Sequence, residues 1–315
     1  MKKNKLTKQL IKFLKKSIPL WLAVLISLDA AGAGVVITGL VMRRKMETIQ
    51  KQLIEVKDPQ AIVKQATADV LPAGGYRTSL KWGTIGKKLV ESGAIDKNKY
   101  QESFKSEADG GSELDIIDGD TGKFIEINEN NSRFVVNTLW ALGLVNKSKV
   151  LDDGPMKTGG TDPANFASTA GWTLGSKPAM ELYSSIGLIP LSPDQQEIVR
   201  KIAENVFRPC CGNSTAFPDC NHGMAALAYI ELAVAGGLPE KQIYKDLLGL
   251  NSFWFPSTYI EMAVYFKRDK NTEWKNVDPK TALSNDYSSA QGAAKINKAI
   301  ENVPGIKSRG GGCGA

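Results

Sequence analysis

A long apolar segment near the N-terminus, IPLWLAVLISLDAAGAGVVITGLVM from Ile18 to Met42, constrains this chain more than any other feature. Its 25 residues contain one charged side chain, Asp29. A helix of that length rises roughly 37 Å, which exceeds the roughly 30 Å hydrocarbon core of a bilayer. Trp21 lies near one end, as interfacial aromatic residues do, and the basic run 43–45 follows the other end. We therefore predict a single transmembrane helix at residues 18–42, with the lipid bilayer as its partner.

Two details of this segment leave alternatives open. The small residues 31–33 follow an apolar run, as a signal-peptide cleavage site does, but apolar residues continue as far as Val41 and favour a retained anchor. A carboxylate at Asp29 is costly in lipid. Together with the glycines beside it, this residue predicts either helix–helix association with an envelope partner or a tolerated lone charge.

The positive charge of the chain is concentrated before the apolar segment. The formal net charge is +7, and residues 1–17 contain seven lysines and no acidic residue, so the remainder is close to neutral. This distribution argues against nucleic acid as a partner. Because more cations precede the span than follow it, we predict residues 1–17 to be a basic cytoplasmic leader. The predicted location is the cell membrane, with one span, a cytoplasmic N-terminus and an extracytoplasmic body.

Glycine and proline divide the rest of the chain. Residues 43–70 predict a helical stalk that ends at the segment LPAGGY. Residues 71–303 predict a mostly helical external domain. Within it, a loop at 151–171 rich in Gly, Pro and Asp is a candidate subdomain break. Residues 304–315 predict a flexible tail of Gly and Cys.

The fold class predicted for the body is mainly α with one small β-hairpin. The stretch LDIIDGDTGKFIEI, Leu114–Ile127, has two β-branched runs around a Gly-Asp-Thr-Gly turn. Gly93 ends one predicted helix, Asp96 caps the next, and Ser192 begins a capping box. Two further predicted helices are apolar around most of their circumference and should be buried: 132–146 and 223–237.

Reactive side chains are concentrated in RPCCGNSTAFPDCNHGMA, Arg208–Ala225, which holds three of the chain's four cysteines and its only histidine. Cys210, Cys211, Cys220 and His222 lie in a predicted loop, since prolines on both sides keep this stretch out of the flanking helices. We predict that the four side chains converge on one point.

Three interpretations of this cluster stay open. Three thiolates and one imidazole make a complete tetrahedral set for zinc, and soft thiolates also suit Cu(I), although the spacing CC-x8-C-x-H differs from the usual zinc knuckles. The same residues suit a thiol–disulfide redox protein, with a vicinal Cys210–Cys211 disulfide or with either residue bonded to Cys220. The third is a non-catalytic envelope binding or scaffold protein in which a disulfide closes the loop.

Whether the chain is an enzyme is left open by its motifs. G-x-S-x-G, H-E-x-x-H, a Walker A loop and G-x-G-x-x-G after a strand are all missing from the sequence. A Cys–His nucleophile pair would use His222 with Cys210 or Cys211. Cys220 suits this role less well, because two residues apart on a helix it would not face His222.

Two features elsewhere extend these interpretations. Cys313, in the tail sequence GGGCGA, is a further thiol with the reach to join the loop or to bond to another molecule. The segment NSFWFPSTY carries Phe253, Trp254 and Phe255. These aromatic side chains either belong to the core or form, with the 151–171 loop, a groove for a protein partner.

Three stretches together resemble a family of uncharacterised membrane-anchored bacterial proteins. They are KWGTIGKKLVESGAIDKNKY, NSRFVVNTLWALGLVN and RPCCGNSTAFPDCNHGMA with FWFPSTY downstream. The resemblance covers most of residues 70–265, and the Cys/His segment is its most distinctive part. It implies a bacterial protein located in the cell envelope, and it implies no activity.

Overall fold

The computed structural model describes residues 42–43, 60–106 and 110–306. The chain divides into two compact units, Met1–Pro59 and Gln60–Ala315. The predicted leader, the anchor at 18–42 apart from Met42, and most of the stalk fall outside the described residues, as do Trp21, Asp29 and Cys313. In the part of the chain that is described, no helix is both long enough and apolar enough to cross a bilayer.

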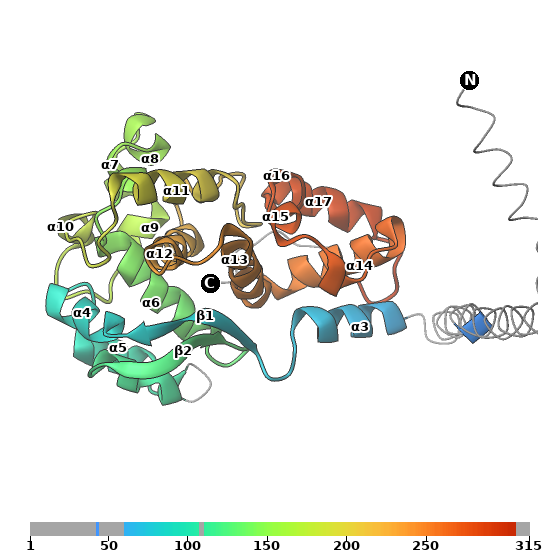
Figure 1. The fold of residues 1–315 in the computed structure, drawn as a ribbon, viewed down its shortest axis with the longest axis horizontal. Coiled ribbons are helices and arrows are strands. Elements are labelled where there is room, and N and C mark those ends of the chain that lie inside the picture. The colour runs from blue at the N-terminus through green and yellow to red at the C-terminus, as the bar shows by residue number, and fades with distance from the viewer. Residues whose placement is uncertain (1–41, 44–59, 107–109, 307–315) are drawn as a thin grey trace, which may run out of the picture. The chain divides into compact units, whose positions relative to one another are not determined.

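The second unit is mainly helical, as predicted (Figure 1). Its longer helices are α3 (Ala61–Val70), α4 (Ile85–Ser92), α5 (Lys97–Ser103), α6 (Ser132–Val145), α11 (Pro193–Glu204), α12 (Asn221–Ala235), α13 (Glu240–Trp254), α14 (Pro256–Lys270) and α17 (Ala290–Ala299). Its single-turn helices are α7 (Lys149–Asp152), α8 (Pro155–Thr158), α9 (Ala167–Ala170), α10 (Ala179–Leu182), α15 (Pro279–Ala282) and α16 (Asn285–Ser288). Its 3-10 helices are η2 (Gly111–Ile117), η3 (Pro163–Asn165) and η4 (Trp274–Asn276).

Local signals placed several helix ends correctly. Gly93 follows α4 in the left-handed conformation, and the Asp96 side chain accepts a hydrogen bond from the first turn of α5. Ser192 and Gln195 form the predicted capping box at the start of α11.

The segment 151–171, predicted to be a loop, contains the short helices α8, η3 and α9. The subdomain break predicted there stays a prediction.

The β structure is one antiparallel pair, β1 (Tyr76–Gly83) with β2 (Thr121–Ile127), in a register that runs from Tyr76↔Ile127 to Gly83↔Thr121. The predicted hairpin within Leu114–Ile127 was therefore half wrong. Its second arm is β2, but its first arm is the 3-10 helix η2. Ile116 and Ile117 are buried, and η2 packs so closely on α4 that a Cβ at Gly86 would lie 2.2 Å from the Ile116 carbonyl oxygen.

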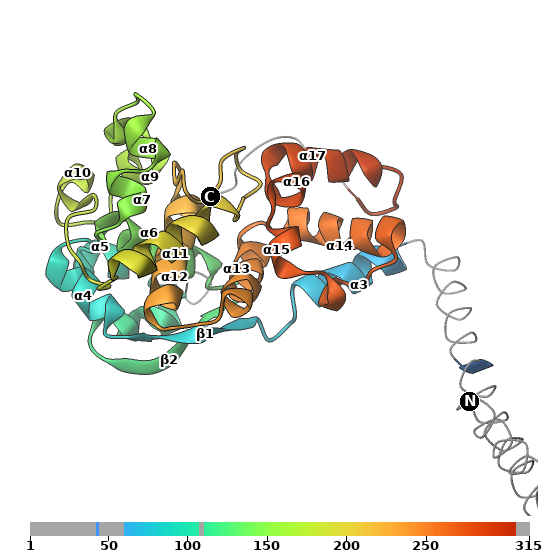
Figure 2. The same cartoon turned by 45° about the horizontal axis from the view of Figure 1, so that its top comes forward.

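Two apolar helices, α6 and α12, pack together at the centre of the unit. Both were predicted to be buried, and most of their side chains are. Gly143 allows their backbones to approach, since a Cβ there would lie 2.2 Å from the Met224 carbonyl oxygen. Figure 2 shows α11 beside α12, and α13 running from α12 toward α14.

The last helices complete the unit. α14 packs against both α3 and α17. Residues 61–70 of the predicted stalk are therefore in contact with the C-terminal helices of the same unit. The start of α12 lies near the α13–α14 junction, and the loop before α12 bonds to Leu283, after α15, and to Ala290 at the start of α17. This arrangement positions the cysteine-rich loop.

Candidate metal centre

The loop between α11 and α12 is fixed by backbone hydrogen bonds to several elements. Phe207 N–H donates to the Leu283 carbonyl, and Ala290 N–H donates to the Cys211 carbonyl at 2.9 Å. On the other side, Ser168 N–H donates to the Asp219 carbonyl. Because a loop held from both sides has few alternative conformations, its side chains keep a defined geometry.

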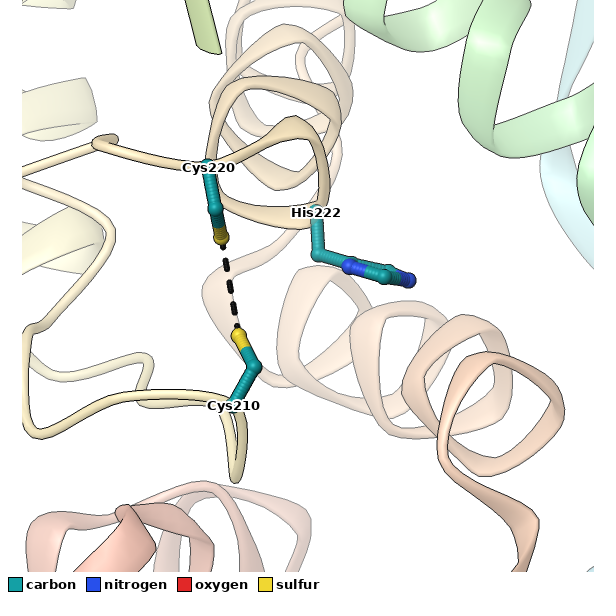
Figure 3. Close-up of side chains that lie close together, drawn as sticks. All are labelled: Cys210, Cys220 and His222. Carbon is teal, nitrogen blue, oxygen red and sulfur yellow. Dashed lines mark hydrogen bonds between the residues drawn. The ribbon is translucent and has the colours of Figure 1, made fainter. Parts of the chain in front are cut away.

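Three of the four predicted side chains converge at the start of α12. One ligand atom each from Cys210, Cys220 and His222 lies within 4.8 Å of the other two. The Sγ atoms of Cys210 and Cys220 are 3.5 Å apart (Figure 3). No disulfide joins Cys210, Cys211 and Cys220 to one another. The predicted convergence is confirmed for these three residues.

Cys220 and His222 reach the same point because Cys220 is not inside the helix. It is the N-cap residue of α12, with an extended backbone at φ −129° and ψ 168°. The expectation that the two side chains would not face each other assumed helical geometry at both positions, and it was wrong. The neighbouring Asp219 and Asn221 are of residue types that commonly cap helices, but neither occupies the N-cap position.

Cys211 lies next to this group but outside it. Its Sγ is 3.8 Å from Asp219 Oδ1 and 3.9 Å from the Asn213 carbonyl oxygen, and it donates weakly to both. The set of mutually close ligand atoms does not include it. The structure thus places three of the four predicted ligands together, while the fourth thiol hydrogen-bonds both to oxygen acceptors and to the sulfurs of Cys210 and Cys220.

A buried arginine, which the sequence analysis did not single out, organises the loop. Arg208 is 1% exposed, and its Nε donates to Cys220 Sγ at 3.1 Å. Nη2 donates to the Phe217 carbonyl at 3.0 Å and forms an ion pair with Asp219. Nη1 donates to the Asn213 carbonyl at 3.4 Å. One guanidinium therefore bonds to the middle and the C-terminal part of the loop, including one of the thiols.

The sequence contained a signal for this arginine. Arg208 and Asp219 are the only charged residues between 205 and 230, and they flank the cysteines. An isolated pair of opposite charges in an otherwise uncharged segment is expected to form an ion pair when the segment is buried.

Aromatic rings cover His222. Its ring centroid lies 4.4 Å from that of Phe255 and 5.8 Å from that of Trp254, and the residue is 6% exposed. Phe253 and Trp254 are buried, and Phe255 is half-buried. The segment NSFWFPSTY therefore forms part of the core beside the cluster, and this burial counts against an exposed partner groove.

The electrostatics of the two facing sulfurs differ. Hydrogen bonds from Cys210 and Cys211, together with the positive charge of Arg208, hold the pKa of Cys220 well below its ordinary value. Hydrogen bonding to Cys211 and Cys220, together with burial, raises the pKa of Cys210. Cys220 is therefore the sulfur that carries the thiolate when only one of the two is ionised.

The arrangement has the composition and spacing of a metal-ligand set. Two sulfurs and one imidazole nitrogen bound to a single ion at about 2.3 Å and 2.0–2.1 Å would lie roughly 3.4–3.8 Å apart. The 3.5 Å separation of the sulfurs falls in this range. The second shell is also present, because Arg208 donates to one of the ligand sulfurs.

Comparison with known proteins adds no name to this site. No family model, no curated protein and no solved structure matches the chain.

Proposed function

We propose that this protein binds one soft or borderline metal ion, zinc or copper, through Cys210, Cys220 and His222. The observation that carries the proposal is the convergence of three ligand atoms within 4.8 Å on a loop fixed from both sides. Thiolate and imidazole are the ligands that these ions prefer. A metal ion also stabilises two thiolates at a separation where they would otherwise repel each other.

The test is metal content combined with ligand replacement. The reduced full chain, purified in detergent and loaded with zinc or Cu(I), should retain about one equivalent after desalting. Cys210→Ser, Cys220→Ser and His222→Ala should each reduce retention strongly, since three-ligand sites lose affinity when one ligand is removed. Ser214→Ala, in the same loop, keeps all three ligands and should bind as the wild type does. Equal retention by all five proteins would contradict the proposal.

A second candidate function is a thiol–disulfide couple. Its support is the 3.5 Å separation of Cys210 and Cys220 Sγ and the lowered pKa of Cys220. In this reaction the Cys220 thiolate attacks one sulfur of a substrate disulfide and releases the other as a thiol. Cys210 then displaces the second substrate thiol, so two protein thiols are oxidised and one disulfide is reduced.

Thiol counting separates the two candidates. Metal-free protein treated with a disulfide oxidant should lose two reactive thiols reversibly if the couple operates. Metal-loaded protein should be protected, and chelation should restore reactivity. Loss of thiols from Cys211 rather than from Cys210 and Cys220 would contradict a couple at this pair.

We also propose an extracytoplasmic location in a bacterial cell envelope, with residues 18–42 as the anchor. Support comes from the sequence alone: the length of the apolar segment, the lysines that precede it and the resemblance described above. Carbonate extraction of membranes and protease treatment of intact cells test this location. Release by carbonate would contradict the anchor, and full protection from the protease would contradict the orientation.

A further inference from the structure

We infer that the ion is monovalent copper, held by three protein ligands, and that Arg208 favours it over zinc through its charge. This inference rests on the proposed metal-binding function and names the ion. Three features of the described residues carry it: the number of ligand atoms, the buried guanidinium and the packing around His222.

The number of ligand atoms suits Cu(I) better than zinc. The mutually close set comprises two sulfurs and one nitrogen. Cys211 hydrogen-bonds to both of these sulfurs and also to Asp219 and Asn213, but it is not part of the set. Structural zinc sites take four protein ligands in a tetrahedron. Cu(I) is a softer ion that prefers sulfur, and it is stable with three ligands. A site with three ligand atoms is complete for Cu(I), whereas zinc would add a fourth ligand, either another side chain or a water molecule.

The charge of Arg208 acts in the same direction. Its Nε lies 3.1 Å from Cys220 Sγ, so an ion bound to that sulfur would also lie close to the guanidinium. With both thiolates ionised the ligands carry two negative charges. A zinc ion neutralises both thiolate charges. Cu(I) neutralises one of them, and the other remains to interact with the arginine. The repulsion between Arg208 and the ion is also twice as large for a divalent ion, because Coulomb energy scales with charge.

Asp219, which forms an ion pair with Arg208, cancels only part of this preference. It is the other charged partner of Arg208, but its side chain is 21% exposed, whereas that of Arg208 is 2% exposed. It also accepts a hydrogen bond from Asn213 Nδ2 at 3.0 Å. Water and Asn213 therefore share the charge of the carboxylate, and the guanidinium remains the buried charge nearest the sulfurs.

The packing of His222 limits the entry of a fourth ligand. Phe255 and Trp254 lie against its ring at centroid distances of 4.4 and 5.8 Å. These apolar rings offer no further ligand atom and exclude water from their side of the imidazole. The neighbouring Trp254 also provides a fluorescence signal for binding.

The experiment compares the two ions on the full chain in detergent, kept reduced and anaerobic. Cu(I) is supplied as its acetonitrile complex against a competing chelator, and zinc is supplied as the sulfate. We expect one equivalent of Cu(I), quenching of Trp254 fluorescence that is absent in Trp254→Phe, and an X-ray absorption spectrum with two sulfurs and one nitrogen. Cys211→Ser should give the same stoichiometry and spectrum as the wild type.

Arg208 variants test the effect of charge. Arg208→Gln should shift the ratio of zinc to Cu(I) affinity toward zinc by about tenfold. Arg208→Lys, which keeps the charge, should stay within about threefold of the wild-type ratio. If Arg208→Gln does not fold, the wild-type spectrum and the Cys211→Ser variant still test the three-ligand Cu(I) site.

The outcomes separate this inference from the proposed function. A spectrum with three sulfurs, loss of binding in Cys211→Ser, or several copper ions per chain would overturn the three-ligand site while leaving metal binding intact. An unchanged selectivity in folded Arg208→Gln would overturn the role of its charge. Retention of zinc but not of Cu(I) would overturn the choice of ion. Retention of neither would refute the proposed function itself.

Discussion

Gly223 lies directly against the guanidinium of Arg208. A Cβ at residue 223 would stand 2.6 Å from both Cζ and Nη2 of the arginine. Gly223 belongs to the first turn of α12, next to His222, so the space that it leaves open lies beside the Cys/His cluster. The missing side chain at 223 thus allows the arginine to reach Cys220 Sγ.

Gly223→Ala should displace Arg208 and weaken the site. The added methyl group would overlap the guanidinium, and overpacking of this kind costs about 1–3 kcal/mol. We expect lower stability in urea and a lower affinity for the ion, even though alanine is the better helix former. Gly119→Ala is the matched control, since a Cβ there meets nothing within 4 Å. If Gly223→Ala were as stable as Gly119→Ala and bound the ion as tightly, the close packing of Gly223 on Arg208 would be contradicted.

Gly143→Ala should be more damaging, although it lies outside the cluster. Its Cβ would stand 2.2 Å from the Met224 carbonyl oxygen, and a backbone atom cannot rotate away as a side chain can. Separation of α6 from α12 should lower the free energy of unfolding by on the order of 3 kcal/mol. Denaturant melts compared with Gly187→Ala, where a Cβ meets nothing within 4 Å, check the prediction. A difference below about 1 kcal/mol would contradict it.

The fold could be predicted wherever one segment carried its own signal. Gly93, Asp96 and Ser192 mark helix ends through backbone chemistry that depends on a few neighbouring residues. The strand pairing could not be predicted in the same way. β2 pairs with β1, which lies far earlier in the chain, because the run that precedes β2 is a helix packed on Gly86. Such a choice depends on tertiary packing rather than on local pattern.

The candidate site, like the fold, could be predicted from the sequence only in part. Scarcity of histidine and cysteine led to the prediction that Cys210, Cys211, Cys220 and His222 meet, and three of them do, Cys211 being the exception. The backbone conformation of Cys220 decided that it faces His222, and no residue type specifies an extended N-cap there. The role of Arg208 depends on contacts with Phe217 and Cys220, which exist only after the chain has folded.

Asp246 should be a strong determinant of stability. Its buried carboxylate accepts hydrogen bonds from the Tyr76 and Tyr229 hydroxyls, the Ser79 N–H and Gln242 Nε2. Asp246→Asn would turn an amide N–H₂ toward some of these donors, and should cost on the order of 3 kcal/mol in urea unfolding.

Variants that each remove one hydrogen bond to the carboxylate are the control for Asp246→Asn. Burial and the nearby carboxylate raise the pKa of both Tyr76 and Tyr229, so each hydroxyl keeps its proton and donates it. Tyr76→Phe and Tyr229→Phe each remove one donor and should each cost about 1–2 kcal/mol. If Asp246→Asn were no more destabilising than Tyr76→Phe or Tyr229→Phe, the carboxylate would not be accepting several stabilising hydrogen bonds at once.

Glu231 is fully buried in the middle of α12, where Asn146 Nδ2 donates to its Oε2 at 2.9 Å. Burial raises the pKa of this carboxyl from 4.5 to about 8. The folded protein therefore keeps a proton on Glu231 at pH values where the unfolded chain has released it. Ionisation of this group opposes folding.

The pH dependence of stability should reveal this group. Between pH 4.5 and about 8 the folded state binds one more proton than the unfolded state, so stability falls as pH rises, by up to about 1.4 kcal/mol per pH unit. Below 4.5 both states are protonated, above 8 both are ionised, and Glu231 then adds no slope. Glu231→Gln cannot ionise, so its stability advantage over the wild type should grow between pH 5 and 8. Urea unfolding of both proteins across this range gives the difference, and parallel curves would show that Glu231 is ionised in the folded protein at neutral pH.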